Sequence, residues 1–294
     1  MKGPFINPFT DLGFKRIFGS EDSKSVVIDM LNAIIGDENR IESIEYNDKE
    51  QPPMSADGRT VIYDIYCQTQ DGRHIIVEMQ SEKQRYFKKR TLYYAARSIA
   101  RQGKKGERKY DFDAVYVVSF LRFTDSDISD SVRSEIMLMN VRTKRVFTDA
   151  VRFIYVQMPL AKKTEAECKN NFDYWIYTLN NMETLDKMPF TDKNPAFVDL
   201  IDLATYDKMT EDEQIAYDRS LKRMWDYDAI MDYARETAHE AGVAEGMEKG
   251  MEKGRAEGKA EGEMNVAKNL KKLGLPIDVI MLATGLSKEE VEKL

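Results

Sequence analysis

The chain has 294 residues, of which 42% are hydrophobic and 32% charged, and its formal net charge is −7 at pH 7. This composition predicts a soluble globular protein with room for one large domain, or for one domain with appendages. The acidic balance argues against a protein that coats nucleic acid, and no apolar run is long enough to cross a membrane. Two cysteines and an N-terminus without an apolar core predict neither disulfides nor a signal peptide, so we expect a cytoplasmic protein.

The N-terminal part is predicted to contain two helices and a strand. Thr10 or Asp11 can cap a short helix whose apolar residues recur at helical spacing, and Ser23–Ile35 shows a second helical pattern. Ile41–Tyr46 alternates between apolar and polar residues, as strands do. Residues 47–58 are polar and contain two adjacent prolines, which predicts a loop.

Residues 60–80, TVIYDIYCQTQDGRHIIVEMQ, predict the β-hairpin that the rest of the chain supports. Both halves of this segment are rich in β-branched and aromatic residues, which favour strands. Asp71 and Gly72 lie between the two halves and form a strong turn signal. The length of the loop at this turn decides which side chains share a face of the sheet.

The register of the hairpin determines where its acids lie. A two-residue turn would place Asp64 and Glu78 on opposite faces. A three-residue loop that ends at a left-handed Gly72 pairs Asp64 with Glu78 and also pairs Ile62 with Gln80. We predict the second register, because it is a common form of hairpin that requires glycine at the last position of the loop.

Two carboxylates opposed across a sheet repel each other unless a cation lies between them. Oxygen ligands suit Mg²⁺ or Mn²⁺, which can activate water and hold a phosphate. The alternative is that Asp64 and Glu78 lie on a solvated face of the sheet. The apolar neighbours of both acids favour the metal site.

A basic segment follows the hairpin. Lys83–Lys109 contains eleven Lys and Arg and one acid, a local net charge of +10, and Gln84–Gln102 within it predicts a helix. We expect Arg90 and Arg97 to contact a phosphate backbone, with Tyr94 supporting the site. The alternative is a core helix with packed aromatic residues and a solvated basic face.

The remaining pattern predicts a mixed α/β sheet flanked by helices. Ala114–Leu121 is apolar throughout, as central strands are, and Ser134–Asn140 and Val151–Met158 follow as strands. From Thr164 the pattern is helical. We expect four parts, namely a core domain at residues 1–160, a helical cover at 161–240, a helical linker at 241–264 and a small helical module at 265–294.

Glycine recurs at every fourth position of the predicted linker, from Gly242 to Gly262. Each glycine destabilises a helix by up to about 1 kcal/mol relative to alanine. One interpretation is close helix–helix contact in a homo-oligomer. The other, which we favour, is a marginally stable solvated helix. In the last module, Ser287 and Glu290 have the spacing of a capping box.

Four segments stand out by their order and spacing, and the resemblance that they carry extends over most of the chain. They are Asp64 with Glu78-Met79-Gln80 after the hairpin, the opening segment Phe9–Gly19, the helical segment Arg90–Tyr94 and the glycine-punctuated tail from Gly242. They resemble the PD-(D/E)XK nuclease superfamily, and in particular the Rpn-type family of recombination-promoting nucleases and transposases.

The resemblance implies a restriction-endonuclease-like core, with a helical C-terminal extension, that cleaves DNA with Mg²⁺ or Mn²⁺ and is associated with recombination or transposition. It implies that Asp64 and Glu78 are metal ligands. Gln80 stands where the motif lysine usually lies, and Tyr63 replaces the motif proline. Asp11 is either an additional acid, as the first helix provides in this superfamily, or the N-cap of that helix.

An amide at position 80 can orient water but cannot neutralise charge in the transition state. We therefore expect a Lys or Arg elsewhere in the chain to supply the missing cation, with Lys15 and Lys83 as candidates. If none does, the fold is that of a weak or inactive nuclease that acts as a nucleic-acid or protein interaction module. A nuclease that cleaves RNA would use the same site chemistry.

Overall fold

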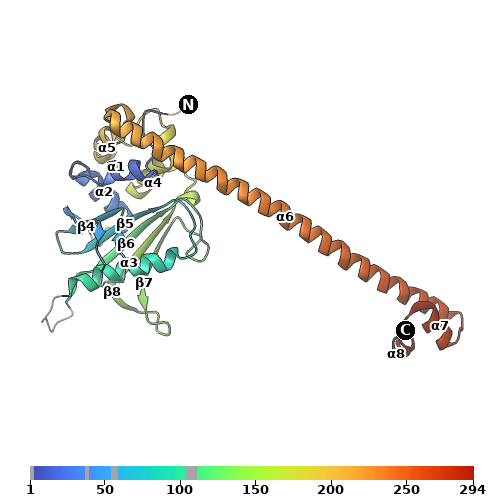
Figure 1. Ribbon diagram of the computed structural model, residues 1–294. Coiled ribbons are helices and arrows are strands. Elements are labelled where there is room, and N and C mark those ends of the chain that lie inside the picture. Colours follow the sequence, from blue (N-terminus) through green and yellow to red (C-terminus); the bar gives the residue numbers. More distant parts are fainter. Residues whose placement is uncertain (1–2, 37–39, 54–58, 104–110) are drawn as a thin grey trace. The chain divides into compact units, whose positions relative to one another are not determined.

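The computed structural model describes residues 3–36, 40–53, 59–103 and 111–294. Within these residues, a six-stranded mixed sheet has the order β1-β4-β5-β6-β8-β7, with helices packed against it (Figure 1). Its strands are β1 (Ile44–Tyr46), β4 (Ile65–Thr69), β5 (His74–Gln80), β6 (Val115–Leu121), β7 (Arg133–Met139) and β8 (Val146–Gln157). The predicted mixed α/β architecture is confirmed.

The connections place one end of β5 next to the start of a helix. β4 and β5 form an antiparallel hairpin, and β5 and β6 run parallel. The chain crosses between those parallel strands through helix α3 (Phe87–Gln102). β8 is parallel to β6, and β7 is antiparallel to β8. Because parallel strands need such a crossover, the N-terminus of α3 lies near the carboxyl end of β5.

Alternate side chains of the central strands pack into two different cores, one on each face of the sheet. Val77 and Val118 belong to the larger core, whereas their neighbours Ile76 and Val117 belong to a smaller core against α3. The larger core is formed with helices α1 (Asp11–Phe18), α2 (Lys24–Ile35), α4 (Asn171–Asn181) and α5 (Ala196–Ala204). Side chains that lie an even number of residues from Ile76 along β5 therefore also face α3.

Several local predictions are confirmed. Thr10, rather than Asp11, is the N-cap of α1, since its hydroxyl accepts a hydrogen bond of 3.0 Å from the amide of Gly13. Every residue of β6 is buried, as predicted for a central strand.

The structure also contains short 3₁₀ segments, namely η1 (Glu21–Ser23), η3 (Met158–Leu160), η4 (Glu165–Glu167), η5 (Met182–Thr184) and η6 (Tyr206–Lys208).

The chain before β4 differs from the prediction. Strand β2 (Glu50–Gln51) lies in the predicted loop and pairs with β3 (Val61–Ile62) in a separate two-stranded sheet. Ile62 is 58% exposed, and its predicted pairing with Gln80 is wrong. The chain enters the main sheet at Ile65, and the carboxylate of Asp64 just before it accepts a hydrogen bond from the Met79 amide. Residues 54–58 of the predicted loop lie outside the described residues, as do 104–110 of the basic segment.

Most of the C-terminal part of the chain is one long helix, α6 (Glu211–Lys272), which contains the glycines that recur at every fourth position. The chain divides into two compact units, residues 1–224 and 225–294. In the first, Tyr217 and Leu221 of α6 are buried in the larger core. The predicted division at residues 160, 240 and 264, and the predicted oligomer contact, stay predictions.

The second unit has a small core of its own. Ala267, Ile280 and Val291 are fully buried between the end of α6, α7 (Ile277–Thr284) and α8 (Lys288–Lys293). The capping box of Ser287 and Glu290 is confirmed at the start of α8. Among the described residues, no helix is both long and apolar enough to cross a membrane.

Candidate metal and phosphodiester site

The hairpin has the predicted register. Gln68 pairs with His74, and the three-residue loop ends at Gly72, whose φ of 89° is left-handed. Extending this register to the beginning of β4 places Asp64 opposite Glu78. Both side chains point to the face of the sheet that α3 covers, because they share the parity of Ile76. The spacing of the hairpin thus brings the two predicted ligands together.

Each of the two carboxylates accepts a hydrogen bond from the backbone of the opposite strand. Oδ2 of Asp64 accepts from the amide of Met79 at 2.8 Å. Oε1 of Glu78 accepts from the amide of Asp64 at 3.4 Å. These contacts take the place of ladder hydrogen bonds at the point where β4 begins. They hold both side chains in position without neutralising either charge.

The pair of acids is costly to ionise. Glu78 is 7% exposed, and its pKa is raised well above the ordinary value, first by burial and then by the negative charge of Asp64. Burial also raises the pKa of Asp64, against the hydrogen bond from Met79 and the positive charge of Lys15. A buried and a half-buried carboxylate with raised pKa values need a cation to stay ionised. Such a pair is a candidate functional site.

Gln80 and Arg90 are joined at the edge of this pair. The guanidinium of Arg90, on α3, donates to Oε1 of Gln80 and, at 2.7 Å, to Oε1 of Gln84. Nε of Arg90 is buried and has no hydrogen-bond partner among the described residues. The positive charge of Arg90 lowers the pKa of Glu78 and of Asp64, although burial dominates at both. A cation is therefore present beside the acids although position 80 is an amide.

Lys15 and Asp11 approach Asp64 from α1. Their side chains form an ion pair of 2.6 Å. The positive charge of Lys15 lowers the pKa of Asp64, and the negative charge of Asp11 raises it. A cavity of about 290 Å³ opens beside Asp64 and is lined by Lys15, Gly19, Tyr46, Asn47, Asp48, Lys49, Asp64, Ile65 and Tyr66.

Lys83 and Arg97 have other partners. The ammonium of Lys83 lies 3.1 Å from the carboxylate of Asp125. Arg97 is 4% exposed, and its guanidinium donates to the carbonyl oxygen of Pro52 at 2.6 Å. The structure therefore does not bring these two cations to the acids, and their predicted nucleic-acid contacts stay predictions.

Tyr94, on α3, lies near the acids, and its predicted supporting role stays a prediction. Its ring packs edge-on against that of Tyr63, with centroids 5.2 Å apart. The pKa of the Tyr94 hydroxyl is raised to about 12, mainly by burial and further by the charge of Glu78. Tyr94 therefore stays protonated at neutral pH and adds no negative charge next to the acids.

The acids suit a divalent ion that keeps part of its water shell. Among the described residues, no group of three or more His, Cys, Asp or Glu side chains lies close enough to hold a metal. Mg²⁺ is commonly held by one or two carboxylates, with water and substrate phosphate as its other ligands. The hard oxygen donors of Asp64 and Glu78 fit this requirement.

Lys49 was missed by the sequence prediction. It lies in a polar segment without a local signal, and it reaches the cavity beside Asp64 because the amide of Tyr63 donates to its carbonyl oxygen at 3.0 Å. The pairings of β1 with β4 and of β2 with β3 create this proximity.

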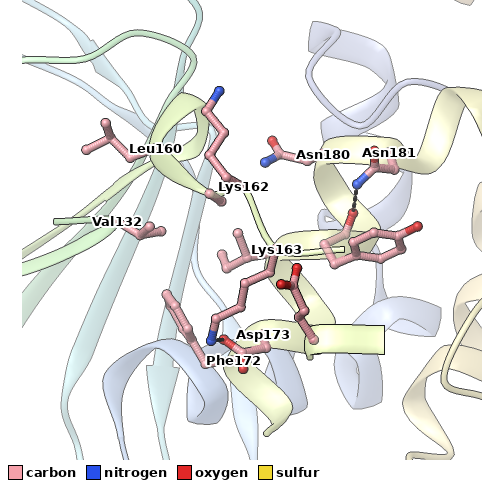
Figure 2. A pocket seen from close by; sticks show the side chains of 12 residues that line it. Val132, Leu160, Lys162, Lys163, Phe172, Asp173, Asn180 and Asn181 are labelled. Carbon is pink, nitrogen blue, oxygen red and sulfur yellow. Dashed lines mark hydrogen bonds and ion pairs between the residues drawn. The ribbon is translucent and has the colours of Figure 1, made fainter. Parts of the chain in front are cut away.

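A second cavity, of about 430 Å³, lies against α4 (Figure 2). Two acids line it: Asp173 accepts hydrogen bonds from Nζ of Lys163 at 2.7 Å and from the amide of Lys169 at 3.1 Å, and Glu167 accepts two from Thr164 at 2.8 Å. Asn181 donates to the carbonyl oxygen of Tyr177. Because these polar groups are engaged with one another, we do not assign chemistry to this cavity.

The chain matches the family described as PD-(D/E)XK nuclease family transposase over residues 8–234. This match covers most of the chain and contains α1, the hairpin and α3. The protein therefore belongs to the PD-(D/E)XK nuclease family transposases. No curated protein and no solved structure matches the chain.

Proposed function

We propose that this protein is a metal-dependent DNA endonuclease that hydrolyses phosphodiester bonds in the course of recombination or transposition. One observation carries the proposal, namely the placement of Asp64 opposite Glu78 on the face of the hairpin that α3 covers. Membership of the nuclease family supports the same conclusion.

Asp64 and Glu78 are the proposed ligands of Mg²⁺ or Mn²⁺. When bound, such an ion supplies a polarised water and offsets negative charge on the phosphate. The backbone hydrogen bonds from Met79 and Asp64 help to fix the positions of both carboxylates. Their burial strengthens the attraction for a cation, because water screens the charges less.

Arg90 and Lys15 are the proposed cations that face the phosphate. Arg90 lies against Gln80 and is fixed by two side-chain acceptors. Gln80 retains an acceptor lone pair, so it can orient a water molecule while it holds Arg90. Lys15 lies on the cavity side of Asp64. In this arrangement the side chains of Arg90 and Lys15 supply the positive charge that a lysine at position 80 would provide.

A plasmid-nicking assay tests the proposal. Supercoiled DNA is incubated with Mg²⁺, Mn²⁺, Ca²⁺ or EDTA, and the wild type is compared with Asp64→Ala and Glu78→Ala. We expect cleavage with Mg²⁺ or Mn²⁺ that is lost with EDTA and in both variants. Full cleavage by either variant contradicts the assignment of the ligands. Matched DNA and RNA substrates determine which nucleic acid is cut.

The glutamine at position 80 favours a second candidate, a catalytically inactive interaction module on the same fold. A folded wild type that binds nucleic acid or a protein but never cleaves with any metal supports that candidate. We propose a cytoplasmic location for either function, because the amino-acid composition predicts one.

A further inference from the structure

The exposed face of α3 carries two tyrosines that the catalytic proposal does not use. Tyr86, the N-cap residue, is 60% exposed and Tyr93 is 43% exposed. They are seven positions apart in the sequence, which places them on one side of the helix about 10 Å apart along its axis. Lys89 is exposed between them. Large aromatic side chains in water at such positions offer stacking surface.

The same face is positively charged. The guanidinium of Arg85 lies over the ring of Tyr86 at 5.5 Å from its centroid, and that of Arg97 lies over Tyr93 at 5.9 Å. Arg85 and Lys89 are exposed, so their charges are available to a ligand in solution. Alternating cations and aromatic rings match a polyanion whose repeating units also have flat π-faces.

One residue of α3, Arg90, connects the tyrosine face with the strand that carries Glu78. Arg90 joins the two regions, since its amide donates to the carbonyl oxygen of Tyr86 at 2.9 Å while its guanidinium contacts Gln80. On the helix, Tyr86 and Tyr93 border the side that carries Arg90 and Tyr94. A strand whose phosphate reaches Asp64 is therefore close to this face of α3.

We propose that Tyr86 and Tyr93 stack on unpaired bases of the substrate strand, so that the protein acts on single-stranded or locally unpaired DNA. In a duplex, both faces of each base are covered by neighbouring bases, and a tyrosine has no face to stack on. Stacking on aromatic side chains is the usual way in which proteins bind single strands without reading sequence. This inference rests on the proposed nuclease function and specifies its substrate.

Binding is measured apart from cleavage. The Glu78→Ala protein in EDTA is titrated into a fluorescein-labelled single strand and into the matching duplex, and anisotropy is recorded. We expect tighter binding of the single strand and an affinity loss of at least about five-fold on Tyr86→Ala or Tyr93→Ala, with the duplex little affected. Tyr86→Phe and Tyr93→Phe should retain binding, because phenylalanine retains the ring.

Two further measurements make the result specific. A 2-aminopurine base in the strand should lose fluorescence on binding, and this quenching should be absent in the Tyr86→Ala, Tyr93→Ala double variant. Tyr233→Ala removes a tyrosine that is 73% exposed on α6 and should change neither signal. Circular dichroism of each variant confirms that α3 has folded.

Equal binding of single strand and duplex overturns the proposal, and so does unchanged binding by folded alanine variants. Capture of a protein partner through Tyr86 and Tyr93, without binding of single strands, also overturns it. If the wild type never cleaves but the tyrosine-dependent binding holds, the nuclease function fails and the single-strand surface stands. If cleavage depends on Glu78 and ignores the tyrosines, the function stands and this inference fails.

Discussion

The guanidinium of Arg90 donates a hydrogen bond to the side-chain oxygen of Gln80, and this contact joins α3 to the last residue of β5. The motif position at the end of β5 therefore holds an amide, and a cation from the next helix reaches it. A positive charge is therefore present at the acid pair, although the residue that carries it, Arg90, lies ten residues after Gln80.

Arg90→Ala is expected to lower DNA cleavage by about 100-fold or more, the effect of removing one donor that stabilises transition-state charge. Arg90→Lys should recover part of the rate, because it restores the charge without the planar fork. Gln80→Lys alone should not increase the rate, since it places two cations side by side and breaks the contact with Arg90. Initial rates of plasmid nicking measure all three variants.

Thermal unfolding of the same variants serves as the control. If Arg90→Ala cleaves as fast as the wild type, Arg90 is not the replacement cation. If Gln80→Lys raises the rate, the native amide limits cleavage. That result supports the second candidate function, the catalytically inactive interaction module.

Glu78→Gln is expected to stabilise the metal-free protein at neutral pH. The folded pKa of Glu78 is raised, so the native state binds more protons than the unfolded state, and stability falls as pH rises from the ordinary value of 4.5 through the raised value. The glutamine variant lacks this fall. Urea unfolding in EDTA across that pH range should show a smaller slope for the variant than for the wild type.

A divalent ion should reverse the order of the two proteins. At 100 times its dissociation constant, a ligand of the native state adds about 2.7 kcal/mol, and only the wild type retains both carboxylates. Glu45→Gln, which changes an exposed acid on β1, is the matched control and should alter neither the slope nor the metal response. A wild type that gains no stability from Mg²⁺ or Mn²⁺ argues against the metal site.

The sequence predicted the hairpin because its determinants are local. The alternation of side chains and the left-handed glycine at position 72 define the register, and the register alone places Asp64 opposite Glu78. Helical spacing likewise predicted α3. The class of fold followed from the order of such elements.

The remaining site residues depend on tertiary contacts that spacing does not encode. Arg90 and Arg97 are seven residues apart on one side of α3, yet Arg90 contacts Gln80 whereas Arg97 is buried against the carbonyl of Pro52. Nothing in the local pattern distinguishes them. Lys49 lies at the cavity because β1 pairs with β4 and β2 pairs with β3, and β2 and β3 are too short to show a pattern in the sequence.

Lys15→Ala is expected to shift the low-pH limb of cleavage to higher pH. Lys15 lowers the pKa of Asp64, and its loss also leaves the charge of Asp11 without its ion-pair partner, which acts in the same direction. More Asp64 is then protonated at a given pH, so the rate falls, by on the order of ten-fold or less because exposed charges are screened.

The pH–rate profile of Lys83→Ala is the comparison, since Lys83 is bound to Asp125. We expect its low-pH limb to coincide with that of the wild type. A shift in Lys83→Ala that equals or exceeds the shift in Lys15→Ala reverses the assignment of the two lysines.

Gly72→Ala tests how far the hairpin loop controls the site. The left-handed φ of 89° disfavours alanine, and a Cβ there would lie 2.7 Å from a carboxylate oxygen of Asp113. We expect a loss of about 1–3 kcal/mol in the free energy of unfolding, with weaker cleavage wherever the register shifts. Gly103→Ala is the control, because its nearest neighbour would be 3.7 Å away and no left-handed angle is required. Urea unfolding and the nicking assay compare both variants, and equal stability of Gly72→Ala and Gly103→Ala contradicts a strained loop as the determinant of the register.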